Sequence, residues 1–322
     1  MKIGVPRETA AGERRIALVP ESAKKLVEQG NEVVIEKARS ASVDFPDAAY
    51  VAAGARIAAD AGEVLAGSDL VLKIQPPSEA EIASLRTGAV LVAILQPFQN
   101  GDTVRRLAEK SVTSFSLDLL PRITRAQAMD VLSSMSTIAG YKGVLIAAAA
   151  LPKMVPLLMT AAGTLKPARF LILGVGVAGL QAIATARRLG AVVEAFDIRP
   201  AVKEQVESLG ARFVAHEAIQ SGGETKGGYA TELTPEQQAR QREVLGKHIG
   251  DADAILCSAL VPGRRAPILL SAEQVALMRP GSVVVDLAAD QGGNCALSKP
   301  GETVEHGGVR VLAPLNVPAS VP

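Results

Sequence analysis

A chain of 322 residues with a formal net charge of +1 is long enough for two domains, and it has no basic field that would indicate binding to nucleic acid or to an anionic membrane surface. Hydrophobic residues make up 48% of the sequence and aromatic residues only 3%, which is typical of helices packed tightly on a parallel sheet. Two prolines and a lysine interrupt the longest apolar run, Val144–Met159, so we expect no direct membrane span. Cys257 and Cys295 lack metal-ligand spacing, which predicts reduced thiols, no metal site and a cytoplasmic protein.

Through the first 120 residues, short apolar runs alternate with amphipathic segments that begin with polar residues. This alternation predicts parallel strands joined by helices, and therefore an N-terminal Rossmann-like lobe over residues 1–125. Strands are expected at Lys2–Val5, Glu32–Glu36, Leu70–Ile74, Val90–Leu95 and Thr113–Leu117.

A helical segment at residues 126–150 follows and is predicted to link this lobe to a second one over residues 151–322. The expected strands of the second lobe begin at Phe170 and continue through Val192–Phe196, Arg212–Val214, Ala254–Cys257, Ser282–Asp286 and Val309–Leu312. The predicted fold class is α/β, with two doubly wound Rossmann-like lobes whose parallel sheets are separated by a cleft, where ligands of such folds bind.

The segment 169–200 is the most informative region of the sequence. An apolar run enters Gly174-Val-Gly176-Val-Ala-Gly179, a helical pattern follows from Val177, and a second apolar run ends on Asp197. In a dinucleotide-binding turn the first glycine makes a tight turn, the second lets the backbone approach the pyrophosphate, and the third packs helix on strand. The order of strand, glycines, helix, strand and acid therefore predicts a dinucleotide site.

The acid at the end of the second strand indicates which dinucleotide binds. A carboxylate at Asp197 accepts hydrogen bonds from ribose hydroxyls and repels a 2′-phosphate, which favours NAD(H) over NADP(H). Arg199 lies close by and weakens this preference, and Ile198 between them belongs to the same predicted site.

A glycine-rich stretch interrupts the second lobe at residues 221–230, with four glycines around Tyr229. It is predicted to be a mobile flap that closes over bound ligand, with Gly228 and Tyr229 in contact with the nucleotide. The alternative is a surface insertion without function.

Residues 4–20, 119–144 and 159–191 together resemble the soluble NAD(H)-binding component, domain I, of proton-translocating NAD(P) transhydrogenase, and alanine dehydrogenase is its sister family. The stretches VDLAADQGGNC at 285–295 and NVP at 316–318 extend the resemblance over essentially the whole chain. Relatives of this kind usually continue past NVP with helical sequence that returns to the first lobe, and here that segment is expected to be absent.

The resemblance implies site residues around the nicotinamide and its ribose. A single helix would place Gln127, Asp130 and Ser133 on one face, where an amide, a carboxylate and a hydroxyl complement the carboxamide of nicotinamide. The alternative is a capped helix start, with Thr124 or Asp130 bonded to backbone amides. The implied catalytic residues are Arg122, Gln127, Asp130 and Ser133, with Tyr141 behind them, and Ile123, Ala259 and Leu260 join the nucleotide contacts.

The reactions of the two sister families need different side chains beside the nicotinamide. By resemblance, an alanine dehydrogenase uses an arginine, a lysine, a histidine and an aspartate to bind its substrate and move protons. Arg15, Lys73 and Asp290 stand at matching places, but Gln96 stands where the histidine would be, and glutamine does not titrate. His216, His248 and His306 are expected at the surface. Hydride transfer between two nicotinamides moves no proton in the chemical step and tolerates this change.

The resemblance therefore implies a Re/Si-specific, proton-translocating transhydrogenase subunit that binds NAD(H) as a substrate. NADP(H) would lie on a partner domain III, and protons would cross a membrane-embedded domain II. The chain is expected to be a homodimer in the cytoplasm, held at the inner face of the cell membrane by these partners. Two alternatives stay open, an alanine dehydrogenase-like amino-acid dehydrogenase and a nucleotide-binding module without catalysis.

Overall fold

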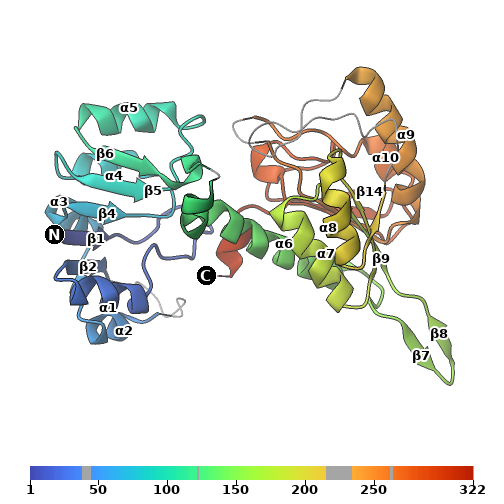
Figure 1. The fold of residues 1–322 in the computed structure, drawn as a ribbon, viewed down its shortest axis with the longest axis horizontal. Coiled ribbons are helices and arrows are strands. Elements are labelled where there is room, and N and C mark those ends of the chain that lie inside the picture. The colour runs from blue at the N-terminus through green and yellow to red at the C-terminus, as the bar shows by residue number, and fades with distance from the viewer. Residues whose placement is uncertain (38–44, 122, 215–233, 262–263, 322) are drawn as a thin grey trace. The chain divides into compact units, whose positions relative to one another are not determined.

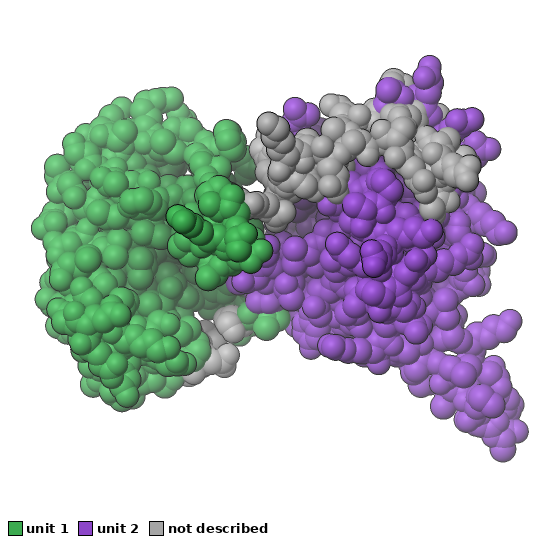
Figure 2. Space-filling view, viewed as in Figure 1, with its two compact units in different colours: residues 1–132, 319–322 green, residues 133–318 purple. Residues whose placement is uncertain are grey.

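The computed structural model describes residues 1–37, 45–121, 123–214, 234–261 and 264–321. The chain forms two compact units, which Figure 2 shows in two colours. The first unit holds residues 1–132 together with 319–322, and the second holds residues 133–318.

The first unit is a six-stranded sheet in the order β3-β2-β1-β4-β5-β6, with every adjacent pair parallel. Its strands are β1 (Lys2–Val5), β2 (Glu32–Glu36), β3 (Arg56–Ala58), β4 (Leu70–Leu72), β5 (Val90–Ala93) and β6 (Thr113–Ser116). Its helices are α1 (Pro20–Glu28), α2 (Asp47–Ala52), α3 (Ala61–Gly67), α4 (Glu79–Ser84) and α5 (Gly101–Glu109), followed by the 3-10 turns Leu117–Leu119 and Thr124–Met129. The five predicted strands are confirmed. β3 was not predicted, because its three residues include Arg56 and form no continuous apolar run.

The second unit is a seven-stranded sheet in the order β11-β10-β9-β12-β13-β15-β14. Its strands are β9 (Arg169–Leu173), β10 (Val192–Phe196), β11 (Arg212–Phe213), β12 (Ala254–Cys257), β13 (Val283–Asp286), β14 (Thr303–His306) and β15 (Val309–Leu312). Among these strands β14, on one edge, is antiparallel to its neighbour, and the other adjacent pairs are parallel. The six predicted strands are confirmed, so both units have the predicted α/β fold.

Helices cover both faces of the second sheet (Figure 1). They are α6 (Val131–Ala150), α7 (Val177–Arg188), α8 (Lys203–Ser208), α9 (Pro235–Asp251) and α10 (Ala272–Val275), and 3-10 turns lie at Pro200–Val202 and Ala289–Gln291. A last 3-10 turn, Val317–Ser320, ends in the first unit. Along β9, Phe170 and Ile172 pack with residues of α6, α7 and α8, while Leu171 and Leu173 pack with residues of α9 and α10. A strand buried on both faces explains why β9 reads as a continuous apolar run.

Two short strands, β7 (Leu158–Thr160) and β8 (Gly163–Leu165), form an antiparallel hairpin that projects from the second unit (Figure 1). The hairpin pairs with no strand of the seven-stranded sheet in the described chain. Its apolar side chains Met159 and Leu165 are exposed, as is Leu157 just before it, and Met159 has 72% of its surface accessible. This hairpin was not predicted from the sequence.

The predicted linking helix begins five residues later than expected. α6 begins at Val131, and the residue before it, Asp130, has a non-helical ψ of 81°. By length and composition alone, α6 is apolar enough to cross a membrane, although no uninterrupted apolar run marks it in the sequence. One such helix is a weak indication, and Val144 and Ala147 of α6 are fully buried in the core of the second unit.

Candidate functional site

The glycine-rich turn, residues 174–179, joins β9 to α7. Gly174 has a φ of +93°, a left-handed conformation that glycine adopts without steric cost. A β-carbon on Gly174 would lie 2.8 Å from the amide nitrogen of Ala259, and one on Gly179 would overlap the carbonyl oxygen of Gly174. Gly176, in contrast, faces open space among the described residues. The turn is therefore compressed at both ends and accessible in the middle.

The open middle of this turn coincides with the start of α7. Gly176 is the N-cap residue, and as a glycine it has no side chain that could cap the helix. The first amide groups of a helix have no partner within the helix, and its dipole places a partial positive charge at this end. Val177 is the first helical residue. This arrangement fits an anionic group such as the pyrophosphate of a dinucleotide.

Asp197 ties the end of β10 to the glycine-rich turn. Its Oδ2 accepts a hydrogen bond from the amide of Val175 at 2.7 Å, and its Oδ1 accepts one from the amide of Arg199 at 2.9 Å. The Arg199 guanidinium donates to both carboxylate oxygens at 2.9 Å, and its Nη2 also donates to the carbonyl of Val175 at 3.0 Å. Ile198 packs on the core beside α9 and α10. The predicted acid is thus at the turn, but it is already engaged.

The segment after β12 lies against the other side of the turn. The Ser258 hydroxyl donates to the carbonyl of Gly174 at 3.0 Å. The Ala259 amide donates to Oδ1 of Asn294 at 2.9 Å, and Nδ2 of Asn294 donates to the carbonyls of Ala259 and Pro267 at 2.9 and 2.7 Å. The Asn294 side chain is fully buried, so it holds the Ala259 backbone in place against Gly174. Leu260, the next predicted contact, is exposed.

Asp286, at the end of β13, organises the loop that carries Asn294. Its Oδ1 accepts from the amide of Ala288 at 3.0 Å, and its Oδ2 accepts from the amides of Asn294 and Cys295 at 2.8 and 2.9 Å and from the Ser298 hydroxyl at 2.6 Å. Neither Asp286 nor Asn294 was predicted from the sequence as part of the site. The sequence pattern that could have indicated them is an acid at the end of an apolar run, VVVD, followed by a loop that contains glycines.

Two buried thiols lie beside this network. Cys257 ends β12 and Cys295 follows Asn294, and both are free cysteines. Burial is the main cause that raises the pKa of both thiols, and the Asp286 carboxylate adds to the rise. Both thiols therefore stay protonated at neutral pH.

The predicted nicotinamide contacts do not share one helical face. Gln127 lies in the 3-10 turn Thr124–Met129, Asp130 lies in the non-helical link, and Ser133 lies in α6. The prediction of one helix through all three was wrong because Asp130 interrupts the helical backbone. Ile123 and Gln127 are exposed, as is Tyr141 of α6. Gln127 and Asp130 belong to the first unit and Ser133 to the second, so their contact with a nucleotide stays a prediction.

Three of the predicted site residues, Arg122, Gly228 and Tyr229, lie outside the described residues, as does the predicted flap at 221–230. Their assignment rests on the sequence alone.

Comparison with protein families covers almost the whole chain. The model of the alanine dehydrogenase/PNT N-terminal domain matches residues 4–139, and that of the alanine dehydrogenase/PNT C-terminal domain matches residues 143–322. The chain belongs to the alanine dehydrogenase/PNT family. The resemblance inferred from its sequence is thereby confirmed.

Both branches of the alanine dehydrogenase/PNT family are similar to this chain. An NAD(P) transhydrogenase alpha subunit of Rhodospirillum rubrum is 47% identical, over all of this chain and 85% of that protein. The structure of transhydrogenase from Sinorhizobium meliloti is 43% identical with a TM-score of 0.91, over all of this chain and 88% of that one. Alanine dehydrogenase of Halomonas elongata is 32% identical, over 93% of this chain and 76% of that protein.

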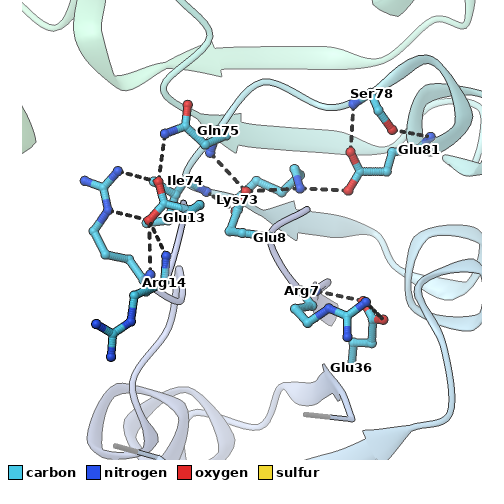
Figure 3. A network of polar contacts seen from close by, with 11 residues as sticks. Arg7, Glu8, Glu13, Arg14, Glu36, Lys73, Ile74, Gln75, Ser78 and Glu81 are labelled. Atoms are coloured by element: carbon cyan, nitrogen blue, oxygen red, sulfur yellow. Dashed lines mark hydrogen bonds and ion pairs between the residues drawn. The ribbon is translucent and has the colours of Figure 1, made fainter. Parts of the chain in front are cut away.

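Lys73, a candidate substrate lysine of the alanine dehydrogenase branch of the family, is enclosed by carboxylates (Figure 3). It has 3% of its surface accessible, and its Nζ lies 2.8 Å from Glu81 and 3.4 Å from Glu8. Burial raises the pKa of the Glu8 carboxyl, while Lys73 and the amides of Ile74 and Gln75 oppose the rise. Lys73 therefore forms buried ion pairs with two carboxylates within the first unit.

Arg15 and Gln96 are the other two residues of the first unit that stand at positions of the alanine dehydrogenase pattern. Arg15 forms a two-point ion pair with the buried Glu13 carboxylate, at 2.6 and 2.8 Å, and Gln75 donates to the same carboxylate at 2.8 Å. Gln96 is exposed just beyond β5 and has a φ of +49°, which is uncommon for a residue with a β-carbon. Glutamine thus occupies a strained backbone position where the dehydrogenase pattern has a titrating histidine.

Asp290 and the histidines are the remaining titrating residues discussed from the sequence. Burial raises the pKa of the Asp290 carboxyl, while a hydrogen bond from the amide of Asn316 opposes the rise. His248, predicted at the surface, is half-buried, with 19% of its side chain accessible, and its Nδ1 lies 2.8 Å from the buried Glu194. His306 is in β14, and His216 lies outside the described residues. Within the described ranges, no group of three or more His, Cys, Asp or Glu side chains is placed to hold a metal ion.

Proposed function

We propose that this chain is the NAD(H)-binding component of a proton-translocating NAD(P) transhydrogenase. The observation that carries the proposal is the glycine-rich turn, which is open at Gly176 beside an uncapped helix start and has an acid at the end of the next strand. The identity of 47% to a transhydrogenase subunit, against 32% to an alanine dehydrogenase, supports the same branch.

The proposed reaction is Re/Si-specific hydride transfer between NADH on this chain and NADP⁺ on domain III of a partner. The hydride carries two electrons, so NADH becomes NAD⁺ as NADP⁺ becomes NADPH. The start of α7 holds the pyrophosphate of NAD(H), Asp197 holds a ribose, and Gln127, Asp130 and Ser133 orient the nicotinamide. Arg122 and the flap residues Gly228 and Tyr229 join this set. Membrane domain II couples the reaction to proton movement and keeps the cytoplasmic chain at the membrane.

The groups available for proton transfer favour this reaction over amino-acid oxidation. A dehydrogenase that acts on an amino acid needs a titrating group and a cation at its substrate. Gln96 does not titrate, and Lys73 is buried between two carboxylates. Direct hydride transfer needs neither group, because the protein only positions two rings and excludes water.

The proposal is tested by mixing the purified chain with an NADP(H)-binding domain III and following reduction of an NAD analogue by NADPH. We expect hydride transfer that depends on both proteins. Good NADH binding without transfer would support a binding module instead. Oxidation of NADH with pyruvate and ammonia, at rates typical of enzymes, would overturn the proposal.

One observation favours alanine dehydrogenase as the second candidate. By resemblance, Asp290 stands where the alanine dehydrogenase pattern has its aspartate, and desolvation raises the pKa of its carboxyl, which suits a proton donor. If that candidate is correct, Asp290→Asn abolishes pyruvate-dependent NADH oxidation. If the transhydrogenase proposal is correct, the same variant leaves hydride transfer with domain III within about twofold, because no proton moves in that step.

Replacing Gln127 by asparagine tests the nicotinamide contacts. The shorter side chain keeps the amide but withdraws it by one methylene, so a misplaced ring slows the reaction more than it weakens binding. We expect single-turnover hydride transfer to fall at least about tenfold while the Kd for NADH changes less than about threefold. Gln99→Asn, at an exposed position in the loop between β5 and α5 of the same unit, serves as the matched control. Equal losses in rate and affinity would contradict the assignment.

The projecting hairpin supports the proposed homodimer. A two-stranded hairpin alone is marginally stable, and this one exposes both its edges and its apolar side chains. We propose that it packs against a second copy of the chain. Met159→Glu should convert the dimer to a monomer by sedimentation analysis, while Leu277→Glu, at another exposed apolar position of the second unit, should leave the mass unchanged. A monomeric parent chain, or a dimer that survives Met159→Glu, would contradict this interface.

A further inference from the structure

We propose that Arg199 competes with the ribose for Asp197, and that Asp197 in turn keeps Arg199 from binding the 2′-phosphate of NADP(H). The inference rests on the proposed binding of NAD(H) at the glycine-rich turn and deepens it. It assigns to Arg199 a latent affinity for the 2′-phosphate of NADP(H) that Asp197 suppresses, which the presence of an acid at position 197 does not by itself imply.

Asp197 has a limited number of acceptor positions. A carboxylate accepts about four hydrogen bonds. Here the amides of Val175 and Arg199 take two of them, and Nε and Nη2 of the Arg199 guanidinium take the other two, at 2.9 Å each. Ribose hydroxyls therefore gain acceptor positions on Asp197 only when the guanidinium moves away.

The Arg199 guanidinium lies beside the glycine-rich turn. The Asp197 and Arg199 side chains have 8% and 16% of their surface accessible, so the ion pair is largely shielded from water. Nη2 of Arg199 also donates to the carbonyl of Val175, inside the turn. The cation thus lies at the place where the ribose of a bound dinucleotide is expected.

The charges of Asp197 and Arg199 balance each other at this place. Paired with Asp197, the guanidinium contributes no net positive charge that would attract a 2′-phosphate. Without the carboxylate, the same guanidinium has the planar donor geometry that binds phosphate at two points. Asp197 therefore has two functions, since it accepts ribose hydroxyls and it suppresses phosphate binding by Arg199.

The test compares three variants by measuring the Kd values for NADH and NADPH with the purified chain. Asp197→Asn keeps an acceptor for the Val175 amide but removes the charge. We expect it to weaken NADH binding and to strengthen NADPH binding, each at least about tenfold, so that the preference reverses. NADPH binding by this variant should weaken steeply with added salt.

The other two variants separate the arginine from the acid. Arg199→Ala removes the competitor, so we expect NADH to bind about threefold to tenfold more tightly and NADPH to gain nothing. In the double variant with Asp197→Asn and Arg199→Ala, the gain in NADPH affinity should disappear. Thermal unfolding shows that each variant is folded, and Asp197→Ser replaces Asp197→Asn if the latter is not.

The outcomes distinguish the role of Arg199 from the proposed function. If Asp197→Asn loses NADH affinity without gaining NADPH affinity, or if Arg199→Ala weakens NADH binding, the role of Arg199 is overturned while the NAD(H) site stands. If Asp197→Asn binds NADH as tightly as the parent chain, the proposed nucleotide site itself is overturned.

Discussion

Replacing Gly179 by valine is expected to abolish NADH binding and to lower the free energy of unfolding by about 3 kcal/mol or more. A β-carbon at Gly179 would overlap the carbonyl oxygen of Gly174 and lie 3.4 Å from the Ser258 hydroxyl. Gly174 has no room to retreat, since the backbone of Ala259 lies directly against it. Urea unfolding and titration with NADH, followed by its fluorescence, measure the two effects.

Gly176→Ala is the matched control for this substitution. Gly176 has a backbone conformation that alanine adopts, and its β-carbon would point into open space among the described residues. We expect a stability within about 0.5 kcal/mol of the parent chain, but weaker NADH binding because a methyl group blocks the approach to the helix start. Normal stability of Gly179→Val would contradict the packing described for the turn, and normal NADH binding by Gly176→Ala would contradict the proposed pyrophosphate position.

Replacing Asp286 by alanine is expected to have the second large effect, although Asp286 is not a proposed ligand contact. The substitution leaves the amides of Ala288, Asn294 and Cys295 buried without their acceptor, at a cost of about 1–3 kcal/mol each. The loop that positions Asn294 loosens, and the hold of Asn294 on Ala259 is lost with it. We therefore expect a loss of at least about 3 kcal/mol in urea unfolding, together with weaker NADH binding.

Ser298→Ala is the control for Asp286→Ala. It removes one of the four donors to the carboxylate and leaves the three amides bonded, so its expected cost is about 1 kcal/mol. If both variants lower the free energy of unfolding equally, the amide hydrogen bonds to Asp286 do not hold the loop in place.

The regions of the fold predicted from the sequence are those encoded within short segments. β9 contains the continuous apolar run Phe170–Leu173 because helices cover both faces of its sheet, and the glycines that follow mark a turn whose conformation is local. The geometric roles of Gly174 and Gly179 could therefore be predicted from their spacing alone. The hairpin β7–β8 was missed because its exposed strands are short and show no alternation.

The features that escaped prediction depend on contacts between distant segments or on a single backbone angle. Asn294 bonds Ala259, 35 residues earlier, and no local pattern marks that pair. The enclosure of Lys73 by Glu8 and Glu81 requires the ends of β1 and β4 to be neighbours in the sheet. The spacing of Gln127, Asp130 and Ser133 suggested one helix, but the ψ angle of Asp130 interrupts it, and three-residue spacing alone does not reveal such a break.

The buried thiol of Cys257 can serve as a chemical probe for opening of the second sheet. Cys257 is the last residue of β12 and has 0% of its surface accessible, and its raised pKa keeps it in the unreactive protonated form. An alkylating reagent therefore reaches it only when the sheet opens, so the rate of alkylation measures the free energy of that opening. The next residue, Ser258, bonds to Gly174 in the glycine-rich turn. A ligand that binds this turn therefore stabilises the closed sheet and slows the alkylation of Cys257. The sheet thus carries an intrinsic chemical probe of ligand binding, with no label added.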